Sequence, residues 1–157
     1  MPDRIIAITG NRNLSEADIA IISAEMWLLV SDSSVKKVYF GGARGADDVA
    51  LVQAFEQRHE WLFPKLVLVV PNKVKHQPRE THDHAIMADE VVELGLPITP
   101  QDFYAAYMSR NRYMVDRATE VVAFWSGDKD SGTYKTMEYA KAKGLPVHHV
   151  KIEGKDK

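Results

Sequence analysis

The sequence predicts an α/β fold: a three-layer Rossmann-like domain with a mainly parallel central sheet of about five strands and helices on both faces. Three observations predict it. Apolar runs of strand length alternate along the chain with segments of helical periodicity. The connections between them are short, which suits parallel strands joined by right-handed crossovers. A glycine-rich loop, residues 41–45, follows one apolar run and leads straight into a helix.

The composition is that of one soluble globular domain. Apolar residues make up 45% of the chain and charged residues 27%, which excludes the disordered and transmembrane classes. A chain of 157 residues can bury one substantial core without disulfides. We expect a single Rossmann-like domain over residues 1–152, followed by a disordered tail, residues 153–157, that is too polar to pack.

The net charge and the cysteine content restrict which binding partners and which cellular compartment we expect. The net charge is −2, so no large basic field holds a nucleic-acid backbone, which counts against nucleic acid as a partner. The absence of cysteine excludes disulfides and thiol catalysis. Residues 1–4 lead into an apolar run that lacks the basic flank and cleavage site of a signal peptide. We therefore expect a cytoplasmic protein that contacts no membrane.

The first repeating unit is a strand, a loop and a helix. Residues 4–9 form a nearly continuous apolar run, typical of a buried strand. The loop Gly10 to Asn13 follows. Ser15 stands three residues before Asp18, a pattern typical of a capping box, and the helix that it starts should extend to about Val30.

The second unit repeats this order. Residues 37–40 predict a strand that runs into the glycine loop, and residues 46–59 predict a helix. Residues 65–70 form a third apolar run, closed by Pro71. Because this run is apolar on both faces, we expect its strand to be central in the sheet.

The next part of the chain is less regular. Residues 73–83 are polar and predict a loop, and residues 85–94 predict a helix. Thr99 and Pro100 are typical of the cap and first residue of a further helix, for which we expect a break near Ser109.

The last unit again alternates. Residues 120–125 predict the fourth strand, residues 126–133 a loop, residues 133–143 a helix, and residues 146–152 the fifth strand.

Four loops should meet at one edge of this sheet. The loops that begin at Gly10, Gly41, Pro71 and Gly127 all leave the carboxyl ends of predicted strands. Ligands of such sheets bind at these ends, near the point where the strand order reverses. The four loops can therefore share one crevice.

The glycine loop has the features of a phosphate cradle. Gly41, Gly42 and Gly45 allow the backbone to approach a ligand closely, and the first turn of the next helix offers unpaired N–H groups to an anion. Arg44 adds a planar hydrogen-bond fork. The alternative is a tight strand-to-helix connection that binds nothing.

Two common nucleotide fingerprints are missing. The dinucleotide pattern G-x-G-x-x-G does not follow the first strand, and the glycine loop lacks the Gly-Lys-Ser/Thr of a Walker loop. The sequence therefore supports neither an ordinary NAD dehydrogenase nor ATP hydrolysis of the Walker type.

Four segments, taken together and in this order, resemble the SLOG superfamily of Rossmann-like proteins. They are Gly10 to Arg12, Gly41 to Asp47, Arg110 to Met114 and Ser131 to Thr133. The superfamily includes the LONELY GUY (lysine-decarboxylase-like) phosphoribohydrolases and the Rossmann core of the DNA-processing protein A family. The resemblance covers roughly residues 4–150. The chain most resembles the small, single-domain members of the superfamily.

The resemblance implies a site for a nucleotide or a nucleotide-derived ligand, with no cofactor and no metal. The loops after the second and fourth predicted strands would grip phosphate and ribose. The candidate ligand-binding residues are Gly10, Asn11, Arg12, Gly41, Gly42, Ala43, Arg44, Gly45, Asp47, Arg110, Asn111, Ser126, Gly127, Ser131, Gly132 and Thr133. Backbone N–H groups at Gly132 and Thr133 suit phosphate oxygens, although Ser131 and Thr133 are equally explicable as plain N-caps.

No catalytic residue can be assigned. Arg110 matches an arginine that assists catalysis in the LONELY GUY enzymes, but Ser109 stands in the place of their preceding acid. Thr136 stands in the place of their glutamate. Cleavage of an N-glycosidic bond needs an acid or a carboxylate. Five aspartates remain as alternatives for that role: Asp47, Asp48, Asp116, Asp128 and Asp130.

Several functions therefore stay open. The protein is a sensor or processor of nucleotides, a phosphoribohydrolase acting on nucleoside monophosphates, or a binder of single-stranded DNA related to DNA processing. DNA binding would need arginines lining a groove with stacking aromatics, namely Arg12, Arg44, Arg110, Arg112 and Arg117. An assembly module is a further alternative, since the resemblance implies a homo-oligomer and residues 103–114 offer an apolar, aromatic surface.

Three histidines stand close together in the sequence. His76, His82 and His84 lie in or next to the polar segment, and a spacing of two in a loop is not diagnostic of a metal. We interpret them as part of a solvated loop.

Overall fold

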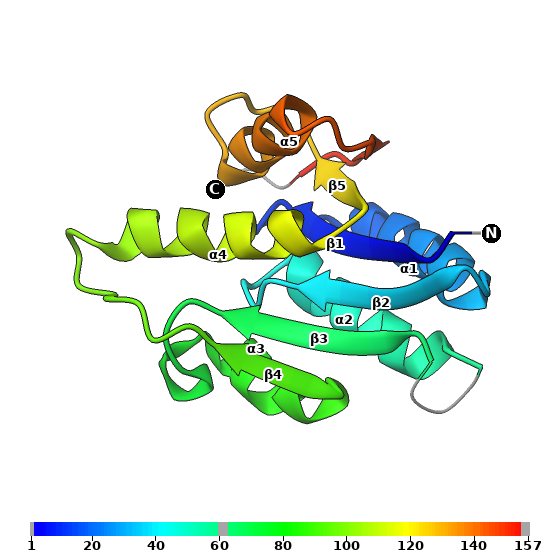
Figure 1. The fold of residues 1–157 in the computed structure, drawn as a ribbon, viewed down its shortest axis with the longest axis horizontal. Coiled ribbons are helices and arrows are strands. Elements are labelled where there is room, and N and C mark those ends of the chain that lie inside the picture. Colours follow the sequence, from blue (N-terminus) through cyan, green and yellow to red (C-terminus); the bar gives the residue numbers. More distant parts are fainter. Residues whose placement is uncertain (1, 60–62, 155–157) are drawn as a thin grey trace.

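A sheet of six parallel strands forms the middle layer of the molecule (Figure 1). The computed structural model describes residues 2–59 and 63–154. Within them the strands are β1 (Arg4–Gly10), β2 (Val35–Phe40), β3 (Lys65–Val70), β4 (Glu90–Glu93), β5 (Glu120–Trp125) and β6 (Val147–Lys151). Their order across the sheet is β4-β3-β2-β1-β5-β6.

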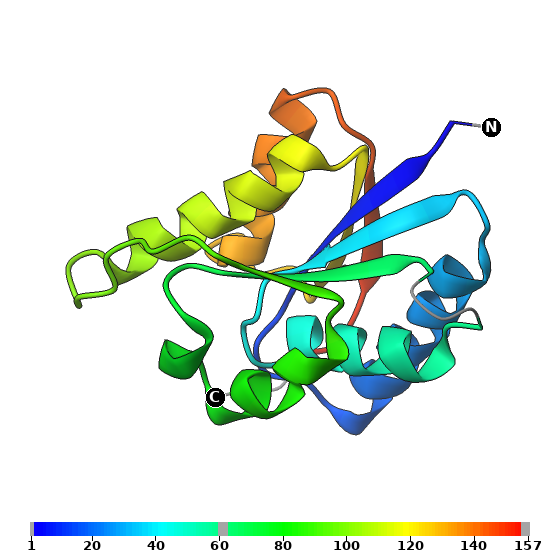
Figure 2. The same ribbon diagram turned by 60° about the horizontal axis from the view of Figure 1, so that its bottom comes forward.

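Helices cover both faces of this sheet, which confirms the three-layer Rossmann-like fold. The helices are α1 (Glu16–Ser31), α2 (Ala46–Gln57), α3 (Arg79–His84), α4 (Phe103–Arg117) and α5 (Gly132–Ala142), with short 3-10 turns η1 (Val74–His76) and η2 (Ala85–Met87). In Figure 2 the sheet separates α4 and α5, yellow-green and orange, from α1 and α2, blue and cyan. None of the described helices is long and apolar enough to cross a membrane.

Successive side chains of each strand point to opposite faces of the sheet, so the hydrophobic core has two parts, one on each face. In β1, Ile6 and Ile8 pack with the buried side chains of α1 and α2, whereas Ala7 packs with those of α4 and α5. In β3, Leu66 and Val67 divide in the same way. The apolar runs are therefore buried on both faces, as expected for central parallel strands.

The strand order reverses between β1 and β5. The chain builds outward from β1 through β2 and β3 to β4, and α4 then returns it to β5 on the other side of β1. β1 and β5 pair in parallel up to Gly10 and Phe124, and the N–H of Asn11 donates to the carbonyl oxygen of Phe124 at 3.0 Å. The loops that follow these strands therefore diverge from a common edge, where such folds bind ligands.

The predicted helix over residues 85–94 is wrong. This segment is the 3-10 turn η2 followed by the edge strand β4, which pairs with β3 from Val67 to Val70. The outer edge of β3 has N–H and C=O groups that need partners, and a short segment with two adjacent valines supplies them. This pairing adds a strand to the expected sheet.

Smaller differences concern the irregular segment and α4. The expected loop over residues 73–83 contains η1 and α3, and α3 is held by Thr81, whose hydroxyl donates to the carbonyl oxygen of Gly42. Helix α4 runs through Ser109 without a break. It begins at Phe103 with Asp102 as its N-cap, and Thr99 starts the turn before it, where its carbonyl oxygen accepts the N–H of Phe103 at 2.9 Å.

The start of the expected tail is packed. The carboxylate of Asp18 accepts the backbone N–H groups of Glu153 at 2.8 Å and Gly154 at 2.9 Å. Ile152, just before them, is buried. The expectation of a polar, unpacked tail therefore does not hold for Glu153 and Gly154, and residues 155–157 lie outside the described part of the chain.

Candidate ligand-binding site

A pocket of about 700 Å³ opens at the carboxyl ends of β1 and β5. Its walls come from the loop after β1, the glycine loop, α4, the loop after β5 and the first turn of α5. Eleven of the sixteen predicted ligand-binding residues line it: Gly10, Asn11, Arg12, Ala43, Asp47, Arg110, Asn111, Ser126, Ser131, Gly132 and Thr133. Four segments far apart in the sequence therefore converge on one cavity.

Gly41, Gly42 and Gly45 lie behind this wall rather than in it. A methyl group on Gly41 would lie 3.0 Å from Nε of Arg110 and 3.1 Å from Oδ2 of Asp47. The glycine loop thus allows two charged side chains to approach the backbone closely. Gly42 instead faces Val70 and Thr81.

The glycine loop uses some of its backbone donors within the protein. The N–H of Ala46, the first residue of α2, donates to the carbonyl oxygen of Asn11 at 2.9 Å. The N–H of Ala43 donates to the carboxylate of Asp47. These backbone N–H groups, which a phosphate cradle would offer to a ligand, therefore bond to other parts of the protein instead.

The last two predicted residues point elsewhere. Arg44 is exposed and does not line the pocket, and its Nη2 lies 3.4 Å from Oδ1 of Asn13. Gly127 is exposed, with open space around it.

The open helix end in the pocket belongs to α5. Ser131 is its N-cap: the hydroxyl accepts the N–H of Tyr134 at 3.1 Å and donates to the carbonyl oxygen of Asp128 at 2.7 Å. Gly132 and Thr133, the first two helical residues, line the cavity. Their N–H groups have no intrahelical partner, as at every helix start, and carry the positive end of the helix dipole.

The floor of the pocket contains a buried arginine and a buried aspartate. Arg110 is 3% exposed and Asp47 is 6% exposed. Burial raises the pKa of Asp47 to about 6, although Arg110, the N–H of Ala43 and Arg12 all oppose this rise. Burial likewise lowers the pKa of Arg110, and the nearby Asp47 opposes that shift.

Both groups keep unused hydrogen-bonding capacity. Nη1 of Arg110 and Oδ1 of Asp47 have no hydrogen-bond partner among the residues that the structure describes. Nε of Arg110 donates to Oδ1 of Asn111 at 2.8 Å, and Nδ2 of Asn111 donates to Oγ1 of Thr136 at 3.0 Å. This chain anchors the guanidinium to α5. An unpaired buried donor is costly, so a ligand that reaches it would relieve that cost.

One wall of the pocket is aromatic. The guanidinium carbons of Arg12 and Arg110 lie 5.1 Å and 5.0 Å from the ring centroid of Tyr107. Phe103 packs against the same ring edge-to-face, with centroids 4.4 Å apart. Tyr104 and Tyr107 both line the pocket, whereas Tyr113 and Trp125 do not.

The structure separates the five candidate acids. Asp47, Asp128 and Asp130 line the pocket. Asp48 instead contacts Nδ1 of His84 at 2.9 Å, and Asp116 accepts from the hydroxyl of Tyr139 at 2.6 Å. Of the three in the pocket, Asp47 alone is buried.

The arginines expected for a DNA groove also separate. Arg12 and Arg110 line the pocket, but Arg44, Arg112 and Arg117 do not. Arg117 packs over the ring of Tyr113 at 3.4 Å. A continuous arginine-lined groove is therefore absent among these five described side chains.

The three histidines are not gathered at one point. Nδ1 of His76 lies 3.0 Å from Oδ1 of Asn72, His84 contacts Asp48, and His82 is exposed. Over residues 2–59 and 63–154, no three His, Cys, Asp or Glu side chains cluster as a metal site would require.

Lining residues that sequence reasoning missed include Thr9, Asn13, Phe103, Met108, Glu153 and Gly154. Thr9 directly precedes Gly10, and Asn13 is the last residue of the predicted loop, so their positions were a usable signal. Glu153 and Gly154 carry no local signal, because only their bonds to the distant Asp18 bring them to the pocket.

No protein-family model and no curated protein sequence matches the chain. Solved structures share its fold. DNA processing protein A from Streptococcus pneumoniae matches 95% of the chain with a TM-score of 0.73 and 18% identity, and the chain spans only half of that protein's length. DNA processing protein A from Helicobacter pylori, in a structure described for its single-stranded DNA binding mode, matches 99% of the chain and 69% of its own, with a TM-score of 0.71 and 17% identity.

A third match has another described ligand. The molybdenum cofactor binding protein from Rippkaea orientalis matches 95% of the chain and 77% of its own, with a TM-score of 0.67 and 18% identity. At these identities the likeness concerns the fold. The chain has a Rossmann-like fold, similar to that of DNA processing protein A.

Proposed function

We propose that the pocket at the carboxyl ends of β1 and β5 binds a nucleotide or a nucleotide-derived ligand. The observation that carries this proposal is the placement of Arg110. Its buried guanidinium lines the pocket with Nη1 unpartnered, together with the first turn of α5. A phosphate beside Gly132 and Thr133 would accept from the helix N–H groups and lie in the field of this arginine.

The remaining walls suit the rest of such a ligand. A volume of about 700 Å³ lies within the usual range of small-molecule sites. The ring of Tyr107 offers an aromatic surface, and Phe103 extends it. Asn11 and Ser126, which also line the pocket and hydrogen-bond to each other at 2.7 Å, supply polar groups for sugar hydroxyls.

The described ligands of the similar structures support the same class. One protein is described as binding the molybdenum cofactor and another as binding single-stranded DNA. Both ligands are anionic and contain rings. A pocket that combines a helix start, two arginines and an aromatic wall suits that chemistry.

A thermal-shift screen against nucleoside mono-, di- and triphosphates tests the proposal, because a ligand of the native state raises the melting temperature. Arg12→Ala should weaken the best ligand about fivefold, equivalent to about 1 kcal/mol. Arg44→Ala is the matched control, since Arg44 is also an exposed arginine near the pocket but does not line it. Equal losses in both variants, or no stabilising nucleotide at all, would contradict the proposal.

Single-stranded DNA is the second candidate, favoured by the fold shared with DNA processing protein A. Arg12, Arg110 and Tyr107 provide a cationic and stacking surface. Against it, three exposed carboxylates lie at the pocket in addition to the buried Asp47: Asp128, Asp130 and Glu153. Fluorescence anisotropy with a labelled oligodeoxynucleotide at two salt concentrations tests whether the protein binds single-stranded DNA. Binding that falls steeply with salt supports this candidate, and no binding at low salt ends it.

Hydrolysis of the bound ligand is a further step that the position of Asp47 favours. A buried carboxyl with a pKa of about 6 is still partly protonated near pH 6 and can donate that proton to a leaving base, while water takes the place of the base on the sugar. Chromatography of the ligand after incubation would detect the free base. An Asp47→Asn variant should bind without turnover, and release of base by this variant would exclude the role.

The homo-oligomer implied by the resemblance stays a prediction. Sedimentation velocity tests it, and a monomer at all concentrations would contradict it.

A further inference from the structure

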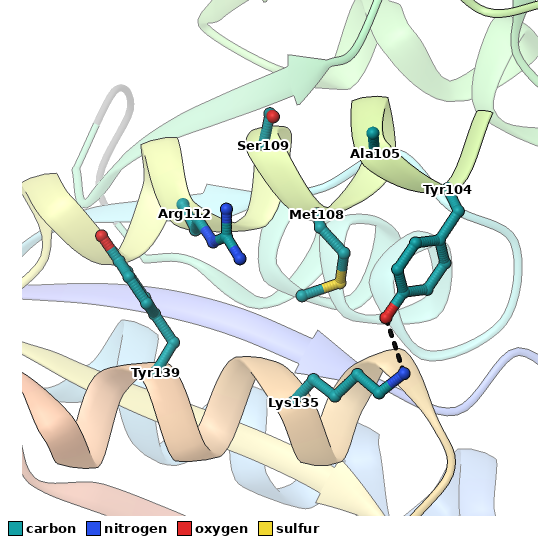
Figure 3. A pocket seen from close by; sticks show the side chains of 7 residues that line it. All are labelled: Tyr104, Ala105, Met108, Ser109, Arg112, Lys135 and Tyr139. Atoms are coloured by element: carbon teal, nitrogen blue, oxygen red, sulfur yellow. Dashed lines mark hydrogen bonds between the residues drawn. The ribbon is translucent and has the colours of Figure 1, made fainter. Parts of the chain in front are cut away.

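A second groove lies along the seam between α4 and α5 (Figure 3). Its volume is about 400 Å³. The lining residues are Tyr104, Ala105, Met108, Ser109 and Arg112 from α4, with Lys135 and Tyr139 from α5. Tyr104 and Met108 also line the pocket at the strand ends. The two hollows are therefore neighbours that share a wall.

The charged side chains that line this groove are both cationic. They are Arg112 and Lys135, and neither pairs with a carboxylate in the described part of the chain. The guanidinium of Arg112 lies over the ring of Tyr139, 5.5 Å from its centroid. In Figure 3 this guanidinium and the Lys135 side chain both lie in the space between the helices.

Two nearby acids are already paired, and a third, Asp130 of the neighbouring pocket, interacts electrostatically with Lys135. Asp116 accepts from the hydroxyl of Tyr139 and from Lys143, and Glu138 pairs with Lys141 at 3.6 Å. No carboxylate is among the described residues that line the groove, so its field stays positive, although Asp130 weakens it beside Lys135. Such a field attracts an anion.

The groove begins close to the proposed phosphate position. Lys135 follows Gly132 by three residues, which is ~4.5 Å along a helix axis. Tyr104 and Arg112 are eight residues apart on α4, so their Cα atoms span ~12 Å. This length can accommodate a further phosphate group of a ligand whose first phosphate lies at the start of α5.

The contact that crosses the groove is easily exchanged. Nζ of Lys135 donates to the hydroxyl of Tyr104 at 2.7 Å, and both side chains are exposed. A hydrogen bond from an exposed lysine to a neutral hydroxyl is weak, and the contact of the same lysine with a charged phosphate is stronger. Lys135 can therefore leave Tyr104 for a phosphate without loss.

We propose that this groove is a second phosphate subsite for the same ligand, which rests on the proposed nucleotide function. The ligand class is a nucleotide with a second phosphate, attached either directly, as in a diphosphate, or through a phosphodiester to a further nucleotide. Lys135 neutralises this phosphate, and Arg112 offers it a planar pair of donors. Tyr104 and Met108 separate the two phosphates.

Isothermal titration calorimetry at one low ionic strength tests the subsite. The probes are AMP, ADP and the 5′-phosphorylated dinucleotide pApA, with GMP, GDP and pGpG as a second series. The wild-type protein should bind at least one two-phosphate probe on the order of tenfold more tightly than the monophosphate. The double variant Arg112→Gln/Lys135→Gln should lose this gain and keep the monophosphate affinity within about twofold.

A matched control has the same charge change on the same helices. Arg117→Gln/Lys141→Gln removes one arginine from α4 and one lysine from α5, and neither residue lines the groove. It should keep the gain. A gain for the diphosphate or for the dinucleotide supports the subsite and identifies how the second phosphate is attached.

Three results would overturn the subsite. The first is monophosphate binding with no gain from a second phosphate in the wild type. The second is a gain that survives in the double variant. The third is equal loss in the control, which indicates a general field effect. If no nucleotide of either series binds, the proposed function fails, and this inference fails with it.

Discussion

A methyl group on Gly45 would lie 2.3 Å from the carbonyl oxygen of Arg12, although these residues belong to different loops. Gly45 also has a φ of +89°, a conformation that side chains disfavour. The N–H of the next residue, Ala46, donates to Asn11. The two loops are therefore fixed against each other by backbone contacts, and this contact places Arg12 at the pocket.

Gly45→Ala should destabilise the fold by about 3 kcal/mol, because the strained φ and the clash with Arg12 add. Gly144→Ala is the matched control. Gly144 has a φ of +80° but open space around it, so only the strain remains, about 1 kcal/mol. Urea unfolding measures both variants. Equal losses would show that the close approach to Arg12 contributes nothing.

Asp18 connects the first helix to the far end of the chain. It is fully buried, completes the capping box of α1 with Ser15, and accepts the N–H groups of Glu153 and Gly154. These bonds hold the pKa of Asp18 below its usual value despite its burial. Asp18→Ala should therefore cost about 2 kcal/mol or more, since three backbone donors lose their acceptor.

The same variant should release one edge of the pocket. Amide hydrogen exchange at Glu153 and Gly154 should accelerate markedly, because both lose their bonds to the carboxylate. Glu16→Ala, an exposed acid in the same turn, should change neither stability nor exchange by more than a small amount. Unchanged protection in Asp18→Ala would mean that other contacts hold the end of the chain.

The regular parts of this fold could be predicted because local signals agree with the tertiary structure. The apolar runs of β1, β3 and β5 are buried on both faces, and caps such as Ser15 define where helices begin. The order of the segments then indicated which loops meet, so most of the expected binding residues line one pocket.

Other features depend on contacts that no local pattern contains. β4 is a strand because β3 offers it a partner, and residues 85–94 alone read as a helix. Arg44 turns outward because the backbone beside it is fixed by the contact between Gly45 and Arg12. The cationic groove needs α4 and α5 side by side, a packing that the sequence of neither helix specifies.

Tyr107 should contribute to ligand binding through its ring. It contacts the guanidinium groups of both Arg12 and Arg110 and lines the pocket. Tyr107→Leu should weaken nucleotide binding about fivefold, as expected for a lost aromatic contact worth about 1 kcal/mol. Tyr107→Phe keeps the ring and should bind within about twofold of the wild type. Calorimetry that shows equal loss in both variants would assign the effect to the hydroxyl instead.

Asp47 should make the stability of the protein depend on pH. Burial raises its pKa from 3.8 to about 6, so the native state retains a proton that the unfolded chain releases at lower pH. The contribution of Asp47 to stability is therefore fully present below about pH 4 and is lost as the pH rises to about 6. A shift of about two units corresponds to about 3 kcal/mol.

Urea unfolding of Asp47→Asn between pH 4 and pH 7 isolates this contribution. The free energy of unfolding of the variant, relative to the wild type, should rise by up to about 3 kcal/mol over that range, because asparagine cannot ionise. For Glu16→Gln, which removes an exposed carboxylate, the free energy of unfolding should depend on pH in the same way as that of the wild type. Parallel profiles for Asp47→Asn would show that the floor of the pocket is better solvated than its burial indicates. An anion bound beside Asp47 should raise its pKa further, so nucleotide binding near pH 6 should take up protons.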